Sequence, residues 1–280
     1  MADQLHHTGG MAYFKNKFLT SKFLQNHILG LFEIVNLKNK SMKKNLIYWP
    51  IAFALILFAS CKKHDQVCKD NTYNPVVSPF NFTKSIQLTN PYFSFQPGKK
   101  YIYEGETADG MERIEIERRP NTKVVNDITC VVIRDRVYIA DKLVEDTDDW
   151  FAQDNSGNVW YMGEYVTDYN PDGSVKDHAG SWEAGVDCAK PGYQMLANPQ
   201  PGNAYRQEYA VGIAEDKAEV IEVGLTVTVP FGTFTNCIKI KETSDIIPDL
   251  FEYKFYAPGV GFIKAVYVTD EEEVVLIDIQ

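Results

Sequence analysis

The chain has 280 residues, with 28 Lys and Arg against 38 Asp and Glu and a formal net charge of −10. Residues 61–280 are more acidic still, with 21 basic and 36 acidic side chains and a formal charge of −15. Such a chain repels phosphate backbones, which excludes nucleic acid as a partner. The acids are scattered along the sequence, and we expect most of them to provide solubility.

The first 60 residues predict the cellular location of the protein rather than its fold. Met42-Lys43-Lys44 is a short basic start, Leu46 to Phe58 is apolar, and Ala59-Ser60-Cys61 follows. This is the layout of a secretory signal peptide over residues 42–60. An uncleaved anchor is the alternative, but the apolar run is short for a membrane-spanning helix, which needs about 20 residues. We interpret residues 1–41 as a non-native or mis-assigned extension.

A Cys directly after Ala-Ser resembles the lipobox of bacterial lipoproteins, whose thiol is acylated and becomes the mature N-terminus. The resemblance implies lipidation of Cys61 and a protein anchored at the outer membrane of the cell envelope through its acyl chains. It leaves the periplasmic and the surface face both open. From residue 61 to about residue 89 the sequence is polar and contains Pro75 and Pro79, which predicts a flexible tether.

From about residue 90 onward the sequence predicts an all-β domain, or nearly so. Arg113 to Glu117 and Leu225 to Val229 alternate polar and apolar residues, the period of a sheet with one wet face. Turn-forming pairs such as Asp109-Gly110 separate the predicted strands. Ala214 to Glu222 is the one plausible short helix, and it could equally be a strand.

An internal repeat runs through this domain. Three landmarks recur in the same order at offsets of 104, 107 and 105 residues: Pro97-Gly98 at Pro201-Gly202, Cys130 at Cys237, and Ala152 at Ala257. We therefore predict an antiparallel curved sheet or open barrel built from two related halves. Repeat A covers about 91–165, a central loop covers 166–200, and repeat B covers 201–280 of the domain at 90–280.

The central loop holds the candidate ligand-binding residues. Trp182, Glu183, Asp187 and Lys190 combine an aromatic face, two acids and a base in a Gly-rich segment. Such a set could line a pocket, because binding sites place a few convergent polar groups on an apolar wall. The alternative is an ordered connector whose Trp fills the gap between the halves and whose charges pair locally.

The start of the same loop offers a weak calcium alternative. Asp168, Asn170 and Asp172 place oxygen ligands at every other position, as a calcium loop does. The twelfth position is Ala179, where a calcium loop requires a bidentate Glu. We therefore favour a turn, and we predict no metal site and no cofactor.

The remaining motifs predict no catalytic residue. The sequence has no Gly-x-Ser-x-Gly, no C-x-x-C and no glycine-rich phosphate loop. Four cysteines follow Cys61, an even number that suits an oxidising compartment. Cys130 and Cys237 hold equivalent places in the two halves, so a disulfide between them is expected if the halves meet across a two-fold axis. Two buried thiols are the alternative.

The segment Tyr256-Ala257-Pro258-Gly259-Val260-Gly261, with Val229 to Phe234 and Gly180 to Asp187, resembles a signature of uncharacterised envelope lipoproteins, many of them from Bacteroidota. At a greater distance the chain is similar to the curved-sheet carriers that ferry lipids or lipoproteins across the periplasm. The resemblance covers about Pro91 to the C-terminus. It implies a β-rich secreted domain and supplies no catalytic residues.

Together these features predict a lipid-anchored, extracytoplasmic binding or carrier module without catalytic activity, whose partner is an apolar small ligand. An outer-membrane scaffold that docks to another envelope protein is the alternative. A hydrolase acting on glycans or peptides is less favoured; the acidic run Glu145 to Asp149 would be its source of an acid and a base.

Overall fold

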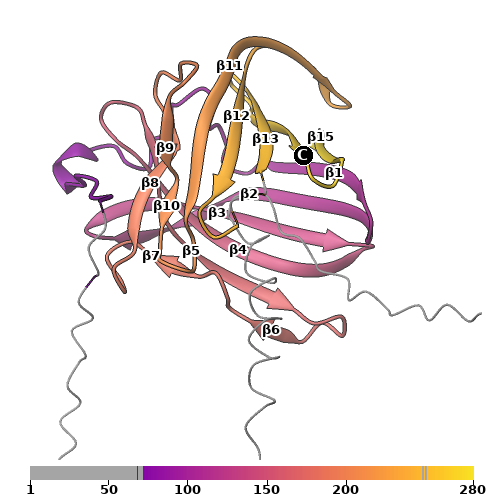
Figure 1. Ribbon diagram of the computed structural model, residues 1–280, viewed down its shortest axis with the longest axis horizontal. Helices are drawn as coiled ribbons and strands as arrows, with labels where there is room; N and C mark the ends of the chain where they lie inside the picture. Colours follow the sequence, from indigo (N-terminus) through magenta and orange to yellow (C-terminus); the bar gives the residue numbers. More distant parts are fainter. Residues whose placement is uncertain (1–67, 69–71, 248, 250) are drawn as a thin grey trace, which may run out of the picture.

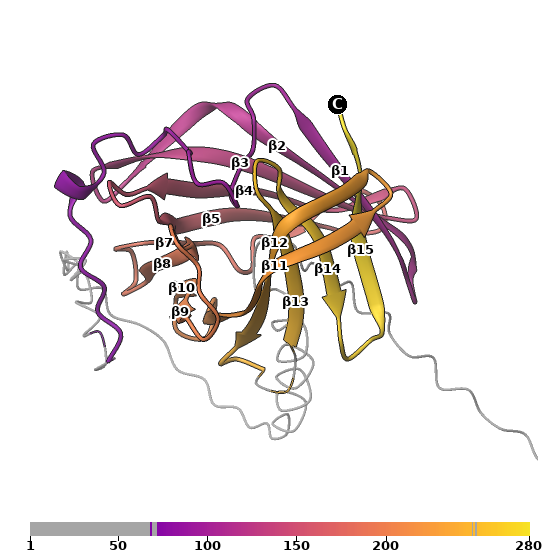
Figure 2. The same ribbon diagram turned by 90° about the horizontal axis from the view of Figure 1, so that it is seen from above.

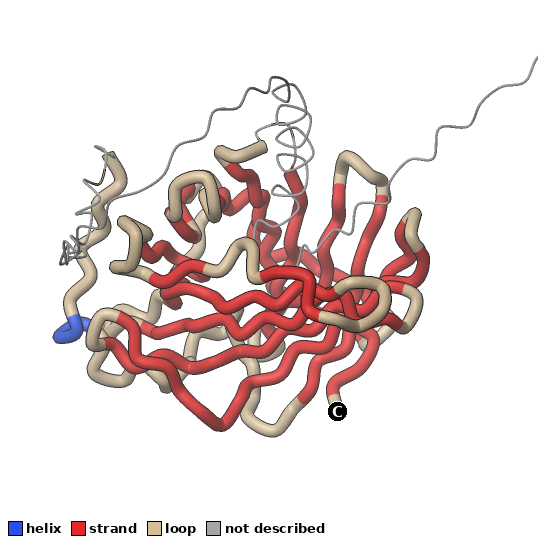
Figure 3. The backbone as a smooth tube through the Cα atoms, turned by 90° about the horizontal axis from the view of Figure 1, so that it is seen from below, coloured by secondary structure: helices blue, strands red, loops and turns tan. Residues whose placement is uncertain are grey.

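The computed structural model describes residues 68, 72–247, 249 and 251–280. Apart from one 3-10 turn at Pro79–Asn81, the regular structure there is β-sheet, as Figure 3 shows. The predicted nearly all-β, antiparallel fold is confirmed. The strands are β1 (Lys100–Thr107), β2 (Gly110–Val125), β3 (Ile128–Ile139), β4 (Lys142–Gln153), β5 (Val159–Tyr169), β6 (Val175–Asp177), β7 (Trp182–Glu183), β8 (Lys190–Met195), β9 (Ala204–Arg206), β10 (Glu208–Tyr209), β11 (Asp216–Val229), β12 (Gly232–Ser244), β13 (Phe251–Ala257), β14 (Gly261–Tyr267) and β15 (Glu272–Ile279).

All fifteen strands belong to one sheet, whose main path runs β10-β8-β5-β4-β3-β2-β1-β15-β14-β13-β12-β11-β9. The short strands β6 and β7 pair with β5 beside this path. Most neighbours are hairpin partners, because short turns join them in sequence. β1 is an exception that links the first run of strands, β1 to β5, to the last run, β11 to β15, because it pairs with β15 at Tyr101↔Ile279. Figures 1 and 2 show the sheet curving strongly, so that β13–β15 cross the direction of β1–β5.

The two ends of this path come together at a single residue. β9 pairs with β11, β10 pairs with β8, and only Gln207 lies between β9 and β10 in the chain. The backbone N–H of Gln207 donates to the carbonyl of Asp216 on the β11 side. The sheet is therefore nearly closed on itself, and it has an interior and an exterior face.

Closure requires a glycine on the opposite side of the seam. A Cβ at Gly192 on β8 would lie 2.2 Å from the carbonyl oxygen of Arg206 and 2.6 Å from the carbonyl carbon of Gln207. Both atoms belong to backbone that cannot rotate away. The seam can therefore form only where β8 carries no side chain.

Alternation along the strands separates the two faces. On β2, Ile114 and Ile116 are buried, whereas Arg113 and Glu115 between them are partly exposed on the outside. Aromatic rings fill much of the interior: Phe151 stacks on Tyr161 at 4.8 Å between centroids, and Phe93 meets Phe151 edge-on at 4.8 Å. Phe93 lies ahead of β1, so the segment before the first strand contributes to the core.

The sequence predicted a flexible tether from residue 61 to about residue 89, but much of this segment contacts the sheet. Within the expected tether, Phe82 is buried and packs edge-on against Trp160. The backbone N–H of Thr89 donates to the Gln153 side chain at 2.8 Å, and the Tyr73 hydroxyl donates to the carbonyl of Pro191 at 2.8 Å. From Thr72 onward the chain is therefore docked on the sheet, because it carries its own aromatic and hydrogen-bonding side chains.

The landmarks of the expected duplication fall on comparable strands. Cys130 lies on β3 and Cys237 on β12, and each strand is the third of a run of antiparallel neighbours. Ala152 and Ala257 lie at the ends of β4 and β13, each followed by a turn into the next strand. The duplication and its boundaries stay a prediction. Ala214 to Glu222, which could have been helix or strand, belongs mostly to β11.

The predicted signal peptide and Cys61 lie outside the described residues. Within the part of the chain that the structure describes, no helix has the length and apolar character needed to cross a bilayer.

Gly192→Ala should destabilise the protein. The added methyl group would overlap the backbone of Arg206 and Gln207 at the seam, and overpacking of this kind typically costs about 1–3 kcal/mol or more. Thermal and denaturant unfolding would measure the loss. Gly232→Ala is the matched control, because its Cβ would meet only the Phe234 ring at 3.9 Å. Equal stability of the two variants would contradict the close approach at the seam.

Candidate functional site

The structure does not bring the four candidate residues of the central loop to one place. Trp182 on β7 is buried in the interior and packs edge-on against Tyr161, with ring centroids 5.3 Å apart. Glu183 follows it on the opposite face and pairs with Lys123 at 3.0 Å. Asp187 lies in an exposed turn with φ of 48°, and the Lys190 ammonium donates to the carbonyl of Tyr73 at 2.7 Å. Glu183 and Lys190 therefore contact different parts of the chain, on β2 and on the segment before β1.

The weak calcium alternative occupies a hairpin turn between β5 and β6. The Asp172 carboxylate accepts hydrogen bonds from the backbone N–H and the hydroxyl of Ser174, at 2.9 and 2.6 Å. The Asn170 side chain also donates to the Ser174 hydroxyl, and Asp168 lies within β5 opposite Asp177. Among the described residues, no three His, Cys, Asp or Glu side chains gather closely enough to hold a metal ion.

The cysteine pairing differs from the expected one. Cys68 is bonded to Cys188, with 5.6 Å between their Cα atoms, whereas Cys130 and Cys237 are buried free thiols. The expected Cys130–Cys237 bridge is wrong because five strands lie between β3 and β12 in the sheet, so equivalent positions in the two runs are not adjacent. Burial raises the pKa of the Cys130 thiol to about 12, so it behaves as a small apolar side chain.

A feature that we did not predict from the sequence lies inside the sheet. Among the described residues, seven acids are buried and Lys254 is the one buried base. The buried acids are Glu112, Asp135, Glu145, Asp149, Glu164, Glu208 and Glu242. The sequence carries a signal for them, since each strand acid that shares the phase of its apolar neighbours must face inward. Asp135, for example, is in phase with Ile133 and Val137.

The strand register places these acids on one face. Asp135 on β3 lies opposite Ile116 on β2 and Thr147 on β4, both of which are buried. On the next pair of strands, Asp149 lies opposite Glu164. Paired residues of neighbouring strands point to the same side of a sheet. The acids of β2 to β5 therefore share the interior with the apolar core.

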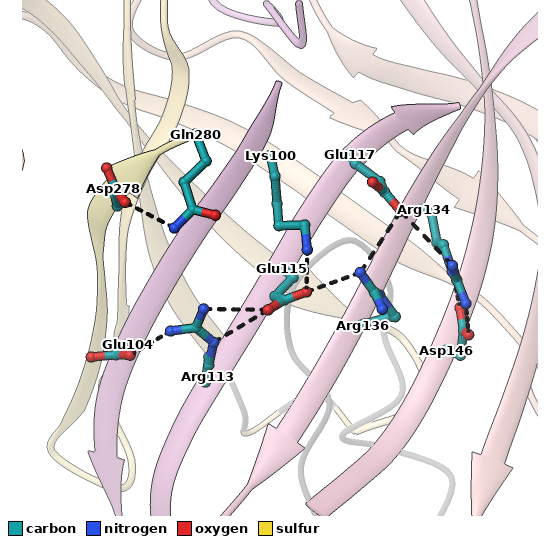
Figure 4. Close-up of polar contacts among 10 residues, drawn as sticks. All are labelled: Lys100, Glu104, Arg113, Glu115, Glu117, Arg134, Arg136, Asp146, Asp278 and Gln280. Carbon is teal, nitrogen blue, oxygen red and sulfur yellow. Dashed lines mark hydrogen bonds and ion pairs between the residues drawn. The ribbon is translucent and has the colours of Figure 1, made fainter. Parts of the chain in front are cut away.

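The exterior of the same strands is also acidic, but there the charges are matched. Figure 4 shows Lys100, Arg113 and Arg136 converging on Glu115, at 3.0, 3.3 and 2.9 Å. Arg134 pairs with Asp146 on the neighbouring strand. Burial opposes ionisation of Glu115, yet the hydrogen bond from Lys100 and the charges of Lys100 and Arg136 hold its pKa below the ordinary value. In the interior, Lys254 is the one buried base among the residues that the structure describes.

Asp135 is the centre of the interior group. Burial and the negative charges of Asp149, Glu145 and Glu112 raise the pKa of Asp135 well above its ordinary value. Its residue is 3 % exposed, and its Oδ1 has no hydrogen-bond partner among the described residues. A buried carboxyl oxygen without a partner costs free energy, which a bound cationic group would recover.

The interior acids of β2 to β5 and those of β10 to β13 lie in one group and affect the ionisation of the same side chains. Burial and the charges of Glu112 and Glu252 raise the pKa of Tyr267, which therefore lies close to acids of both β2 and β13. Burial and the charge of Glu208 raise the pKa of Asp216 in the same way. Lys254 pairs with Glu242 and, at 3.3 Å, with Glu252. The Lys254 ammonium group is therefore surrounded by more carboxyl groups than it can pair with.

A groove of about 370 Å³ on the exterior is a weaker candidate. It crosses β9, β11 and β12 and is lined by Ala204, Tyr205, Arg206, Lys217, Ala218, Glu219, Lys241 and Thr243. Its bases have partners: Arg206 and Lys217 both pair with Asp245, and Lys241 lies over the Phe251 ring at 4.3 Å. The groove therefore offers little free positive charge to an anion.

Comparisons with known proteins supply no function. No family model matches the chain, and no curated protein matches it. A solved structure that is similar to it is a protein of Parabacteroides distasonis described as a "putative lipoprotein". The two share 15 % sequence identity with a TM-score of 0.39, over 68 % of this chain and 99 % of that chain.

Removing the disulfide should lower stability markedly. The bridge spans 120 residues of sequence, and by chain entropy a loop of that length is worth roughly 4–5 kcal/mol, although measured effects range from about 0 to 5. Cys68→Ser/Cys188→Ser should unfold at a lower temperature than the parent, and a reductant should destabilise the parent but not the variant. Cys130→Ala serves as a control that keeps its response to reductant. A parent protein indifferent to reductant would refute the bridge.

Asp135→Asn should stabilise the protein at neutral pH. Because the folded pKa of Asp135 lies above the unfolded value, its contribution is fully favourable below about pH 3.8 and is lost as pH rises through the folded pKa. The variant should gain stability near pH 7 and nothing near pH 3.8, because a neutral amide avoids the cost of ionising a buried carboxyl group.

Denaturant unfolding at several pH values would measure this gain. Asp146→Asn is the matched control, because the same substitution on the exterior removes the ion pair with Arg134 and should be neutral or destabilising. A gain that did not vary with pH, or an equal gain in the control, would contradict the raised pKa.

Proposed function

We propose that this protein is a lipid-anchored, extracytoplasmic binding module without catalytic activity, and that its ligand is an organic cation held by the interior acids. The observation that carries the proposal is the buried excess of acid, seven carboxyl groups against Lys254, with Asp135 Oδ1 lacking a partner. Burying this many carboxyl groups beside one base disfavours their ionised forms in the free protein. Departures of this kind from the rules of stable packing are typical of functional sites.

An amine or guanidinium ligand fits the arrangement better than a metal ion. Carboxyl groups from β2, β3, β4, β5, β10 and β12 are distributed around the interior, and no three metal-type ligands gather within the described residues. A metal ion needs several oxygens at one point. An extended cation with more than one charge can instead meet separated carboxylates one at a time through charge-assisted hydrogen bonds.

The apolar ligand expected from the sequence has less support. Rings of the chain itself occupy the apolar part of the interior: Phe95 packs edge-on against Tyr101 at 5.2 Å, and Tyr103 meets Phe262 at 5.0 Å. All four rings are buried. An apolar guest would have to displace well-packed aromatic side chains.

The proposed location rests on the sequence around Cys61 and on the disulfide. Signal-like residues precede Cys61, which implies export and acylation. A Cys68–Cys188 bridge suits an oxidising compartment, since cytosolic thiols are kept reduced. Outer-membrane attachment is part of this proposal.

An interaction role in the envelope is the second candidate. The long hairpin of β11 and β12 bends over β14 and β15 in Figure 2, and the backbone N–H of Phe231 in its turn donates to the carbonyl of Leu276 on β15 at 3.2 Å. Ile221, Val223 and Phe231 on this hairpin are large apolar residues that remain exposed. Exposed apolar residues gathered on one element favour a protein partner, although singly they need no explanation. Crosslinking through this hairpin in intact cells would test the role, and no reproducible product would count against it.

Binding of spermidine tests the leading proposal. The full chain, expressed with its own leader and purified in mild detergent, should bind spermidine measurably by calorimetry and native mass spectrometry near neutral pH. Asp135→Asn should weaken binding by about 10-fold or more, because a hydrogen bond to a charged group is worth about 1.5–3 kcal/mol. Since this substitution is expected to stabilise the fold, weaker binding would not reflect unfolding.

Asp146→Asn is again the matched control. It removes the same formal charge from the neighbouring strand, but on the exterior, so spermidine affinity should change little. Absence of spermidine binding, or equal weakening by both variants, would refute an interior cation site. Tighter binding of Ca²⁺ than of spermidine would refute the organic class of ligand.

A further inference from the structure

The disulfide fixes where the chain leaves the domain. Cys188 lies in the turn between β7 and β8, and its bond to Cys68 holds the beginning of the described chain there. Tyr73 strengthens the attachment: its hydroxyl donates to the carbonyl of Pro191, its carbonyl accepts from Lys190, and its ring lies 6.0 Å from that of Tyr209. The connection to Cys61 therefore starts from one defined flank.

The remaining connection is short. Cys61 precedes Cys68 by seven residues, which span at most about 25 Å when fully extended. Without the bridge, the first side chain anchored to the sheet would be Tyr73, and the same estimate gives about 42 Å. A lipid on Cys61 would consequently hold this flank, and no other, close to a bilayer.

The same flank exposes apolar side chains. Phe80 and Val76, on the segment that follows the bridge, are 86 % and 83 % exposed and are the most exposed large apolar residues of the described chain. Val186, two residues before Cys188, is 50 % exposed. In Figures 1 and 2 the segment beginning at Thr72, drawn in indigo and purple, runs along one side of the molecule, beside β7 and β8.

We propose that this flank, carrying Val76, Phe80 and Val186 beside the Cys68–Cys188 bridge, rests on the lipid bilayer and gives the protein a fixed orientation there. The inference rests on the proposed acylation of Cys61, which determines that the occupant is lipid and not a second copy of the chain. Apolar contact must supply the attraction, because residues 61–280 carry a formal charge of −15 and stand off from anionic headgroups. The contact is therefore insensitive to salt.

A single introduced indole reports on this contact. After Cys61 the chain has three tryptophans, Trp150, Trp160 and Trp182, and all are buried. Phe80→Trp therefore adds the one exposed indole. In vesicles of phosphatidylethanolamine and phosphatidylglycerol, its emission should fall by roughly half when the acyl chains are brominated, since interfacial side chains sit about 5–10 Å into the headgroup and acyl boundary. Met111→Trp, at a 45 % exposed site at the far end of β2 from the Asn126 turn that contacts Gly185, is the control and should not be quenched.

Two further variants separate this inference from the proposed anchor. Incorporation of labelled palmitate that Cys61→Ser abolishes would establish acylation, and its absence would refute the lipid anchor itself. If palmitate is incorporated but Phe80→Trp is quenched no more than Met111→Trp, the orientation is wrong. Cys68→Ser/Cys188→Ser should keep the acyl label and reduce the quenching of Phe80→Trp, and unchanged quenching would show that the bridge does not set the orientation.

Discussion

The burial of seven carboxyl groups beside a single buried base is the constraint on which the rest of the described structure depends. Removing an ionised carboxylate from water costs several kcal/mol unless a base or hydrogen bonds compensate. On the exterior of β2 to β4 such compensation is present, with Glu115 contacted by Lys100, Arg113 and Arg136. In the interior, Lys254 and its partners Glu242 and Glu252 account for the one buried base. Hydrogen bonds, such as the one that the Tyr161 hydroxyl donates to Asp149 at 2.5 Å, and a proton retained on Asp135 therefore stabilise the interior acids, and in our proposal a bound cation adds to them.

The nearly closed sheet is what makes an acidic interior possible. A flat sheet would expose Asp135 and Glu145 to water, whereas the seam at Gln207 joins β10, which pairs with β8, to β9, which pairs with β11, and so closes the interior. The Gln207 side chain also donates to Glu242 at 2.9 Å, so the residue that closes the sheet contacts an interior acid. Closure and electrostatics are consequently linked through one side chain.

Much of the fold could be predicted from the sequence, because alternation and turn residues are local signals. Arg113 to Glu117 and Leu225 to Val229 do lie on β2 and β11. The interior acids carried the same local signal, but we expected most acids to serve solubility, although Glu145, Thr147 and Asp149 share one phase. The disulfide partner of Cys188 could not be predicted, since it depends on how residues 68 to 99 dock on the sheet rather than on symmetry between repeats.

The titration of Asp135 tests the central claim most directly. Carboxyl-selective ¹³C NMR, with Asp135→Asn to assign the signal, would follow its protonation with and without spermidine. The account predicts that Asp135 stays protonated well above pH 4 in the free protein and that spermidine lowers its pKa, because the cation stabilises the ionised form. An ordinary pKa near 4 that spermidine leaves unchanged would contradict an interior short of positive charge.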